Sequence, residues 1–392
     1  MSYQAIVIGA GLSGAVMAER MASQLGWKVL VLEQRNHIAG NCFDEYDEHG
    51  VLVHRYGPHL FHTDNHEVWE YLSAFTEWHP YEHKVLSRID GQLVPIPFNL
   101  NSIERCFEPN TAAGMIAALR ERFGDGARVP ILELRKEADP LLGELADFIY
   151  RKAFVNYTSK QWGVAPDKIS PEVTARVPVV VSRDDRYFTD AYQAVPKDGY
   201  AAMISRMLAH PDIETQLGVA MDERVRLDWE EKRILLDGES FSGPLIYTGM
   251  LDVLCLGSEP LPYRSLRFEH SHISQPQFQP VTTVNYPNEE AYTRITEFKH
   301  LTGQDHLGTS IVYEYPCQYD QRIALEPYYP LFTDAALARY FSCRELLRCF
   351  PMLVPLGRLA EYKYYDMDDA VSNALSCFRK LSTRGLHEDT DI

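Results

Sequence analysis

The sequence predicts an α/β fold that combines a Rossmann-like domain, built from separate chain segments, with a helical domain and an antiparallel β-sheet domain. Three observations support this prediction. The chain begins with a strand, a glycine-rich loop, a helix and a second strand. Helical periodicity then dominates from about residue 100 to 176. Two later stretches, 177–198 and 262–330, are rich in Val, Tyr, Thr and Pro and alternate between apolar and polar residues, as antiparallel strands do.

The first element is a strand–loop–helix–strand unit with a dinucleotide-binding fingerprint. A short apolar strand over residues 3–9 leads into Gly9, Gly11 and Gly14, which are spaced as G-x-G-x-x-G. In this context Gly9 permits a tight turn, Gly11 lets the backbone approach a pyrophosphate, and Gly14 lets helix and strand pack closely. The free N–H groups at the helix N-terminus would face the phosphates.

The second strand, "KVLVLE", ends at Glu33, roughly 20 residues after the last glycine of the loop. A carboxylate at this place can accept hydrogen bonds from both ribose hydroxyls and disfavours a 2′-phosphate. FAD or NAD is therefore expected rather than NADP.

The pattern divides the chain into three predicted domains. The Rossmann-like domain comprises residues 1–78, 199–250 and 335–392, the helical domain comprises 101–176, and the antiparallel sheet domain comprises 79–100, 177–198 and 251–334. A nucleotide-binding domain assembled from the first, middle and last parts of a chain is more typical of FAD proteins than of NAD enzymes, so FAD is favoured. The turn at Gly357 would cover the isoalloxazine ring, and Arg358 could face the flavin edge or a phosphate.

Composition excludes several classes of protein. A net charge of −17 argues against a general affinity for nucleic acid or for an anionic membrane surface. No stretch approaches the roughly 20 apolar residues of a membrane helix, and the N-terminus lacks the pattern of a signal peptide. The seven cysteines include no C-x-x-C pair, which predicts reduced thiols in a cytoplasmic protein and no metal site.

Two loops carry candidate site residues. The loop "RNHIAGN" after the second strand brings Gly40 and Asn41, a glycine and an amide that can wrap a pyrophosphate. The loop "YGPHLFHT" places His59 and His62 three residues apart, but no further metal ligand lies at a suggestive spacing. A histidine packed or hydrogen-bonded against a flat ring is therefore favoured over zinc, and His83 could join it.

The central part of the chain offers aromatic rings and arginines. In "FVNYTSKQWG", Phe154, Tyr157 and Trp162 could form one wall that stacks on a base or sugar, although core packing of the helical domain is the alternative. Arg176 and Arg294 lie among Val, Pro and Ile, where an unpaired charge is costly. Each arginine should either pair with a carboxylate or bind an anion such as a diphosphate.

Six motifs together resemble the UDP-galactopyranose mutase family, and they occur in the family's order: "YGPHLFHT", "YTSKQWG", "DDRYFTDAYQAVPKDGY", "YTRITEFKH", "PYYP" and "GRLAEYKYYDMDDA". The resemblance implies a three-domain flavoenzyme with an FAD-binding α/β domain, a helical domain and an antiparallel sheet. Such enzymes interconvert the pyranose and furanose forms of a nucleotide sugar without net oxidation, and only the reduced flavin is active. Its N5 is taken to bond to the anomeric carbon as the nucleoside diphosphate departs.

The resemblance also implies roles for individual residues. The residues implied as catalytic are Arg176, Arg294 and His62. Those implied to bind substrate are Phe154, Tyr157, Trp162, Arg176, Tyr187, His83, Asn285, Arg294, Tyr329, Tyr364 and Asp366. Those implied to contact FAD are Gly9, Gly11, Leu12, Ser13, Gly14, Glu33, Gln34, Arg35, Gly40, Asn41, His59, Arg358 and Met367. A substrate loop near residues 168–184 is expected to close over the ligand, and a homodimer is a further expectation.

Three alternatives stay open at the level of the sequence. The segment "FVNYT" departs from the family's F-x-K-G-Y-T, so the same mechanism could act on another UDP-, dTDP- or GDP-linked sugar. An FAD oxidoreductase of the amine-oxidase type would share the cofactor domain but would have no arginine pair aimed at the ring. A flavin-binding protein without catalysis would use the candidate sugar-site residues structurally.

Overall fold

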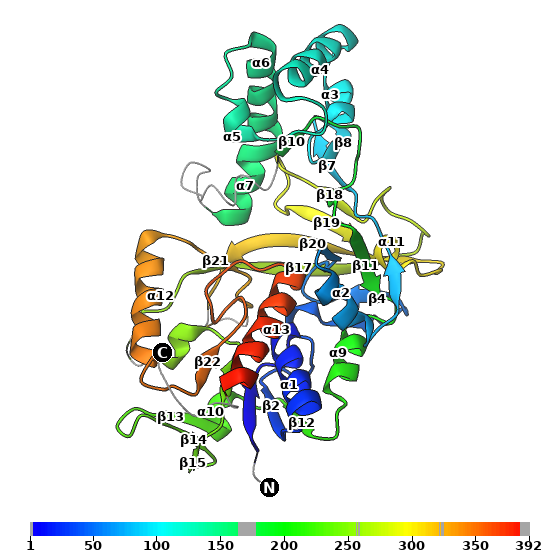
Figure 1. Ribbon diagram of the computed structural model, residues 1–392. Helices are drawn as coiled ribbons and strands as arrows, with labels where there is room; N and C mark the ends of the chain where they lie inside the picture. Colours follow the sequence, from blue (N-terminus) through cyan, green and yellow to red (C-terminus); the bar gives the residue numbers. More distant parts are fainter. Residues whose placement is uncertain are drawn as a thin grey trace.

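The computed structural model describes residues 3–163, 178–255, 257, 259–320, 322 and 325–384. Figure 1 shows helices α3 to α7 at the top, a wide sheet across the middle, and below it an α/β unit that contains the N-terminal strand. The three structural units that the sequence predicts are therefore present, and the fold class is confirmed.

The α/β unit is built on a five-stranded parallel sheet in the order β12-β2-β1-β16-β22. The two central strands that flank the glycine loop are buried throughout, because other elements cover both faces of the sheet. The strands come from distant parts of the chain: β1 (Ala5–Ile8), β2 (Val29–Glu33), β12 (Ile213–Leu217), β16 (Leu245–Tyr247) and β22 (Leu353–Pro355).

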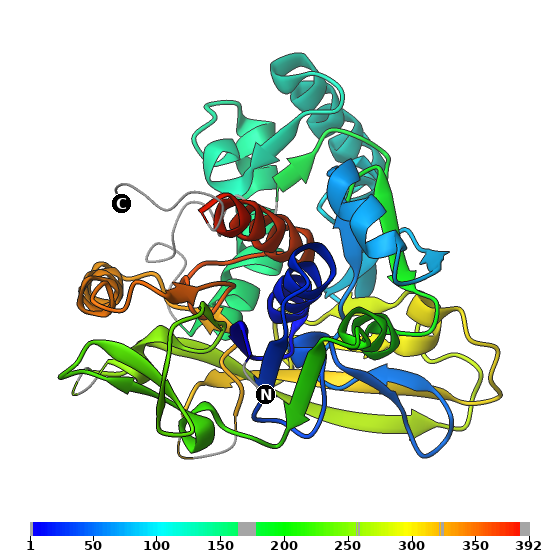
Figure 2. The same ribbon diagram turned by 60° about the horizontal axis from the view of Figure 1, so that its bottom comes forward.

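Helices pack on one face of this sheet, and Figure 2 shows two of them, α1 and α13, side by side. This layer consists of α1 (Leu12–Leu25), α2 (His66–Ser73), α9 (Tyr200–Leu208) and α13 (Met367–Arg384). The opposite face packs against α12 (Asp334–Leu347), a 3₁₀ turn (Leu251–Leu254) and an antiparallel sheet of β13 (Val225–Asp228), β14 (Arg233–Leu236) and β15 (Glu239–Phe241), which follows α10 (Met221–Arg224).

The helical unit has its own hydrophobic core, which also includes side chains of the hairpin β7–β8. It consists of α3 (Leu100–Cys106), α4 (Pro109–Phe123), α5 (Ile131–Leu134), α6 (Pro140–Ile149), a π-helical turn (Tyr150–Phe154) and α7 (Val155–Trp162). Two of these helices begin with side-chain caps: Asn99 and Ser102 form a capping box at α3, and Asp139 caps α6 before Pro140.

A seven-stranded sheet joins the other two units, in the order β21-β17-β20-β19-β18-β7-β8. Neighbouring strands are antiparallel except for the parallel pair β18–β7. The strands are β7 (Val85–Ile89), β8 (Gln92–Ile96), β17 (Tyr263–Ile273), β18 (Thr283–Asn285), β19 (Arg294–Glu297), β20 (Thr309–Gln318) and β21 (Tyr329–Pro330), with α11 (Phe298–Thr302) between β19 and β20.

The segment 177–198 differs from the expectation, because neither of its strands joins the large sheet. The strand β10 (Pro178–Val180) pairs with β9 (Arg128–Pro130) beside the helical unit. The strand β11 (Tyr192–Pro196) lies between β5 (Phe61–Thr63) and β6 (Trp78–Pro80). The alternation of this segment predicted antiparallel strands correctly, but alternation does not say which partner a strand will find. A further hairpin pairs β3 (Asp44–Tyr46) with β4 (Leu52–His54).

Within the described residues, no helix has both the length and the apolar character needed to cross a bilayer.

Replacing Asn99 by Ala should lower the free energy of unfolding by about 2 kcal/mol. Asn99 is only 1% exposed, caps α3 through Ser102, and donates to Asp184 O and Asp185 Oδ1. The replacement would remove a cap and leave buried groups unpaired. Denaturant unfolding measures the change, and Asn101→Ala is the matched control, because Asn101 also donates to Asp185 but caps no helix. Equal losses in both variants would contradict this account.

Candidate active site

A cavity of about 950 Å³ opens where the parallel strands end, at the edge at which open α/β sheets bind their ligands. Its volume falls within the range of roughly 300–1,000 Å³ that is usual for cofactor sites. Every residue that the sequence analysis assigned to FAD lines this one cavity: Gly9, Gly11, Leu12, Ser13, Gly14, Glu33, Gln34, Arg35, Gly40, Asn41, His59, Arg358 and Met367.

Close backbone approaches explain the glycines of the loop between β1 and α1. Gly9 has φ +101°, and a Cβ atom there would lie 2.1 Å from Thr248 Oγ1. A Cβ atom at Gly14 would lie 2.0 Å from the carbonyl oxygen of Gly9. Gly11 is the N-cap of α1 and offers no side chain to the first N–H groups of the helix, which leaves them for an anion in the cavity.

Glu33 is buried at the end of β2, and the backbone holds both of its carboxylate oxygens. Oε2 accepts a hydrogen bond from Ala10 N at 2.9 Å, and Oε1 accepts one from Arg35 N at 2.9 Å. The carboxylate is thus fixed beside the glycine loop, where its remaining lone pairs can accept from ribose hydroxyls.

Arg35 forms an ion pair with Glu326, which the sequence analysis did not single out. Its guanidinium also donates to Asn41 Oδ1 at 3.0 Å and lies over the ring of Tyr56, 4.7 Å from the centroid. Glu326 stands directly before the "PYYP" motif, and an acid there is the only sequence feature that could have suggested this pairing.

A second group of polar residues centres on Arg294, in the middle of the seven-stranded sheet. Its cross-strand neighbours are Asn285 on β18 and Glu314 on β20, so all three side chains project from the same face. Arg294 Nε donates to Glu314 Oε2 at 2.7 Å. Burial by itself would lower the pKa of Arg294, but Glu314, Tyr157 and Tyr329 together outweigh burial, and the pKa lies well above its usual value.

Glu314 is 1% exposed, and among the described residues its second carboxylate oxygen, Oε1, has no hydrogen-bond partner. The sequence pattern did not mark this residue as a candidate. The only sequence feature that marks it is that Glu314 is the single acid in the otherwise uncharged strand segment "SIVYEYP". The ion pair is the carboxylate alternative that the sequence left open for Arg294. Because it uses Nε, however, the two terminal amino groups of the guanidinium bond nothing in the described part of the chain.

Three tyrosines surround this ion pair. Tyr329 on β21 and Tyr364 stack with their centroids 6.0 Å apart and their planes inclined by 7°. Tyr157 on α7 lies close enough that Arg294, Glu314 and Tyr364 all act on its phenol, although burial is the main reason why its pKa is raised. The guanidinium of Arg358, which lines the cofactor cavity, lies 5.0 Å from the ring centroid of Tyr364. Tyr364 therefore connects the cavity with the Arg294 group.

The histidines lie between these two groups. His59 lines the cavity, and burial, followed by Arg358 and Arg294, lowers its pKa to about 4. His83 is buried, with a pKa lowered to about 3 by burial first and then by Arg294 and His62. His62 stacks on Phe188 at a centroid distance of 3.6 Å, so the flat ring expected beside it is, in this structure, a phenylalanine.

The remaining candidates divide into three sets. Tyr187 lies at the edge of His83, 5.8 Å between ring centroids, and Asp366 lines the cavity. Phe154 is 4% exposed and packs in the core of the helical unit, so the structure favours the core alternative for this ring. Arg176 lies outside the described residues, as does the part of the predicted substrate loop before residue 178, and the Trp162 side chain is likewise outside the description.

Residues 178–184 are held in place by backbone hydrogen bonds. Val180 N donates to Phe98 O at 2.8 Å, Val181 N donates to Ala127 O at 2.9 Å, and Ser182 O accepts from Leu100 N at 3.1 Å. These contacts favour a fixed position for this end of the predicted loop.

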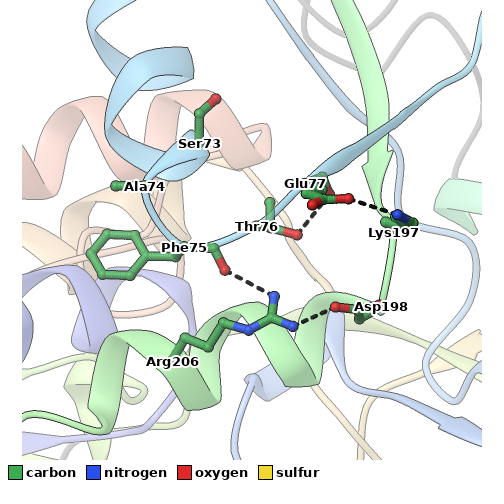
Figure 3. A pocket seen from close by; sticks show the side chains of 8 residues that line it. All are labelled: Ser73, Ala74, Phe75, Thr76, Glu77, Lys197, Asp198 and Arg206. Atoms are coloured by element: carbon green, nitrogen blue, oxygen red, sulfur yellow. Dashed lines mark hydrogen bonds and ion pairs between the residues drawn. The ribbon is translucent and has the colours of Figure 1, made fainter.

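A smaller cavity of about 450 Å³ lies between α2 and α9, and Figure 3 shows that its charged side chains satisfy one another. Arg206 pairs with Asp198 and donates to Phe75 O, and Lys197 pairs with Glu77. We assign no chemistry to this cavity. No group of three or more histidines, cysteines or acids within the described ranges is placed to hold a metal ion.

Residues 152–364 match the family model described as UDP-galactopyranose mutase, and residues 7–75 match an NAD(P)-binding Rossmann-like domain. The chain is 34% identical to a UDP-galactopyranose mutase of Mycoplasma pneumoniae, over 95% of both chains. It is 32% identical to a dTDP-fucopyranose mutase of Escherichia coli, over 95% of this chain and 96% of the other.

Solved structures with a similar fold include a reduced UDP-galactopyranose mutase, with a TM-score of 0.73 at 16% identity over 99% of this chain and 97% of that one. A putrescine oxidase with putrescine bound gives a TM-score of 0.59 at 14% identity over 98% of this chain and 100% of that one.

Replacing Gly14 by Ala should abolish dinucleotide binding, because the new methyl group would collide with the carbonyl oxygen of Gly9. The fraction of purified protein that carries a dinucleotide measures this effect. Gly143→Ala is the control, since a Cβ atom at this position in α6 meets no atom within 4 Å. Full dinucleotide occupancy in Gly14→Ala would show that the loop does not hold the ligand.

Acidification below pH 6.5 should lower the free energy of unfolding. Burial above all lowers the pKa of His54 and His83 to about 3 and that of His59 to about 4. Between pH 6.5 and about 4, the unfolded chain therefore binds protons at these imidazoles that the folded chain does not. Each contributes a slope of up to about 1.4 kcal/mol per pH unit. Urea unfolding at several pH values measures the slope, and His54→Asn should make it shallower. An unchanged slope would refute the assignment.

Proposed function

The chain belongs to the UDP-galactopyranose mutase family, whose members are isomerases, and on this premise we propose that it interconverts the pyranose and furanose forms of a nucleotide sugar. UDP-galactose is the leading substrate. No net oxidation takes place: the anomeric carbon breaks its bond to the ring oxygen and forms a bond to a hydroxyl oxygen of the same sugar, and the former ring oxygen becomes a hydroxyl group.

The cofactor of the proposed reaction is FAD, bound in the 950 Å³ cavity. The site fits this cofactor, because the close approaches at Gly9 and Gly14 shape a loop in which Gly11 leaves the first N–H groups of α1 for a pyrophosphate, and Glu33 is held beside that loop, where a ribose would lie. Gln34, Gly40, Asn41 and Met367 would complete the contacts. When bound and reduced, the flavin supplies a nucleophile that makes a covalent bond to the anomeric carbon of the sugar.

The Arg294 group would hold the diphosphate of the substrate. Glu314 engages Nε and so fixes the plane of the guanidinium, while the two terminal amino groups remain for phosphate oxygens. As the bond to the anomeric carbon breaks, negative charge develops on the diphosphate, and Arg294 stabilises it there. We assign the same role to Arg176.

The other residues of the site would bind and orient the substrate. The phenols of Tyr187, Tyr329 and Tyr364 donate to the diphosphate, while Tyr157 and Trp162 stack on the nucleoside side. Asn285 and His83 lie beside Arg294, and Asp366 faces the sugar from the cavity wall. His62 would respond to the state of the flavin.

One observation carries this proposal: Tyr364 contacts both the cofactor cavity, through Arg358, and the Arg294 group, through Tyr329. A cofactor and a diphosphate bound at these two places would be neighbours. An oxidoreductase would need no guanidinium beside its substrate position.

A trapping experiment tests the function. Dithionite-reduced protein is incubated with UDP-galactopyranose and a hydride donor that reduces iminium ions. The mass of the released flavin is then measured by mass spectrometry. A flavin that carries one hexose, together with UDP-galactofuranose in the supernatant, is the expected result. Consumption of oxygen in proportion to substrate would favour the oxidoreductase instead.

A second nucleotide sugar deserves a direct test, because the chain is 32% identical to a dTDP-fucopyranose mutase, close to its 34% identity with the UDP-galactopyranose mutase. A panel of UDP-galactopyranose, dTDP-fucopyranose and a GDP-linked hexose, each at the same concentration, separates the candidates by kcat/KM. The nucleobase and sugar of the best substrate identify the activity within the family.

Replacing Arg294 by Ala should lower kcat/KM by at least about 100-fold, which corresponds to the roughly 3 kcal/mol typical of losing one electrostatic donor. Steady-state kinetics of the reduced enzyme measure the loss. Arg294→Lys keeps the charge but not the planar fork and should recover only part of the activity. Near-normal turnover of Arg294→Ala would show that Arg294 does not hold the diphosphate of the substrate.

A further inference from the structure

Four polar side chains fix α7 to the seven-stranded sheet, and the proposed function gives none of them a role. They are Asn156 and Lys160 on α7, Arg264 on β17, and Asn288 in the connection between β18 and β19. We call these four residues the α7 seam. In Figure 1, α7 lies directly above this sheet, at the lower end of the helical unit.

Arg264 binds the C-terminal end of α7. Its Nε donates to Gln161 O and its Nη2 donates to Lys160 O, each at 3.1 Å. The guanidinium also packs on the backbone of Gly163, where a Cβ atom would lie 2.8 Å from Nη1. Gly163 has φ +67°, and this left-handed residue ends the helix.

Among the described residues, Arg264 forms no ion pair with a carboxylate, which is unusual for a half-buried arginine. Burial lowers its pKa. The negative end of the α7 dipole takes the place of a carboxylate, because the last carbonyl groups of a helix carry partial negative charge. The side chain therefore acts on the helix rather than on an acid.

Lys160 and the two asparagines bind the helix to the sheet in the other direction. Lys160 Nζ donates to Tyr286 O at 2.8 Å and to Glu290 O at 2.7 Å. Asn156 donates to Asn288 Oδ1, and Asn288 donates to Lys152 O, each at 3.1 Å. The residues that bind α7 in this way are Tyr286, Asn288 and Glu290. All three lie in the connection between β18 and β19, directly before Arg294.

The seam therefore lies between the two sides of the candidate substrate site. Tyr157 stands on α7 one turn before Lys160, and it approaches Arg294. Arg264 is the cross-strand partner of Tyr329 and shares the face of β17 whose residue Phe268 pairs with Glu314. A shift of α7 along the sheet would separate Tyr157 from Arg294 without altering either residue.

We propose that the α7 seam is a positioning device for the nucleotide, in which Arg264, by capping α7 from the sheet, sets the spacing between Tyr157 and the Arg294–Glu314 pair. This inference rests on the proposed function, because it takes the space between these residues as the nucleotide site. Arg264 touches neither cofactor nor substrate in this scheme. It is a positioning residue, and its planar fork suits two neighbouring carbonyl groups better than an ammonium group would.

Arg264→Met tests the inference. The variant should retain its flavin content, while the Kd of UDP, measured calorimetrically, should rise by roughly 10-fold to 100-fold, as expected for a small misplacement of binding groups. The KM for UDP-galactopyranose should rise with it, and kcat of the reduced enzyme should change by less than about 3-fold, because Arg294 remains in place. Arg264→Lys can reach one carbonyl group and should give an intermediate Kd.

Arg267→Met is the matched control. Arg267 lies on the same strand but on its opposite face, where it pairs with Glu269 and covers Tyr315. Its replacement should leave the Kd of UDP unchanged. Lys160→Met removes the other half of the seam and should also raise this Kd, which keeps the inference testable should Arg264→Met fail to fold.

The outcomes separate the two claims. A wild-type protein that binds flavin but neither UDP nor any nucleotide sugar of the panel would refute the proposed function. A wild-type protein that binds UDP, with Arg264→Met and Lys160→Met binding it equally well, would overturn the seam while leaving the function intact. A fall in kcat with an unchanged Kd and KM would also overturn it, because it would place Arg264 in the chemical step.

Discussion

The ion pair between Arg294 and Glu314 is the constraint on which the candidate active site depends. Both residues lie on neighbouring strands of the central sheet, and Glu314 is fully enclosed. Removing either partner of a buried ion pair leaves an uncompensated charge in the interior, which is strongly destabilising, so Arg294 and Glu314 depend on each other. Because the pair is made through Nε, this mutual requirement still leaves the fork of the guanidinium available for a ligand.

The surrounding tyrosines turn this local pair into a site. They come from the helical unit, the end of the large sheet and the loop before α13, and they meet only because the three units pack around the same point. The stacked rings of Tyr329 and Tyr364 then extend the group as far as Arg358 in the cofactor cavity. The site is thus a property of the assembled units, and no single unit contains it.

The sequence predicted those parts of the structure that depend on near neighbours in the chain. The glycine loop and Glu33 follow from contacts within one βαβ unit. It did not reveal Glu314 or Glu326 as partners, because an ion pair between distant residues leaves no local pattern. For the same reason the strands β10 and β11 were recognised as extended but were assigned to the wrong sheet. Phe154 was ambiguous, since an aromatic residue at helical spacing suits a core and a binding wall equally well.

The π-helical turn between α6 and α7 has a consequence for the orientation of the rings on either side of it. A turn with one extra residue rotates everything after it by about 100° relative to an uninterrupted α-helix. Phe154, at the end of this turn, still belongs to the interior of the helical unit, whereas Tyr157 reaches the sheet. Because of the widened turn, a continuous helical segment packs in the core of the helical unit before the turn and against the seven-stranded sheet after it, without an intervening loop.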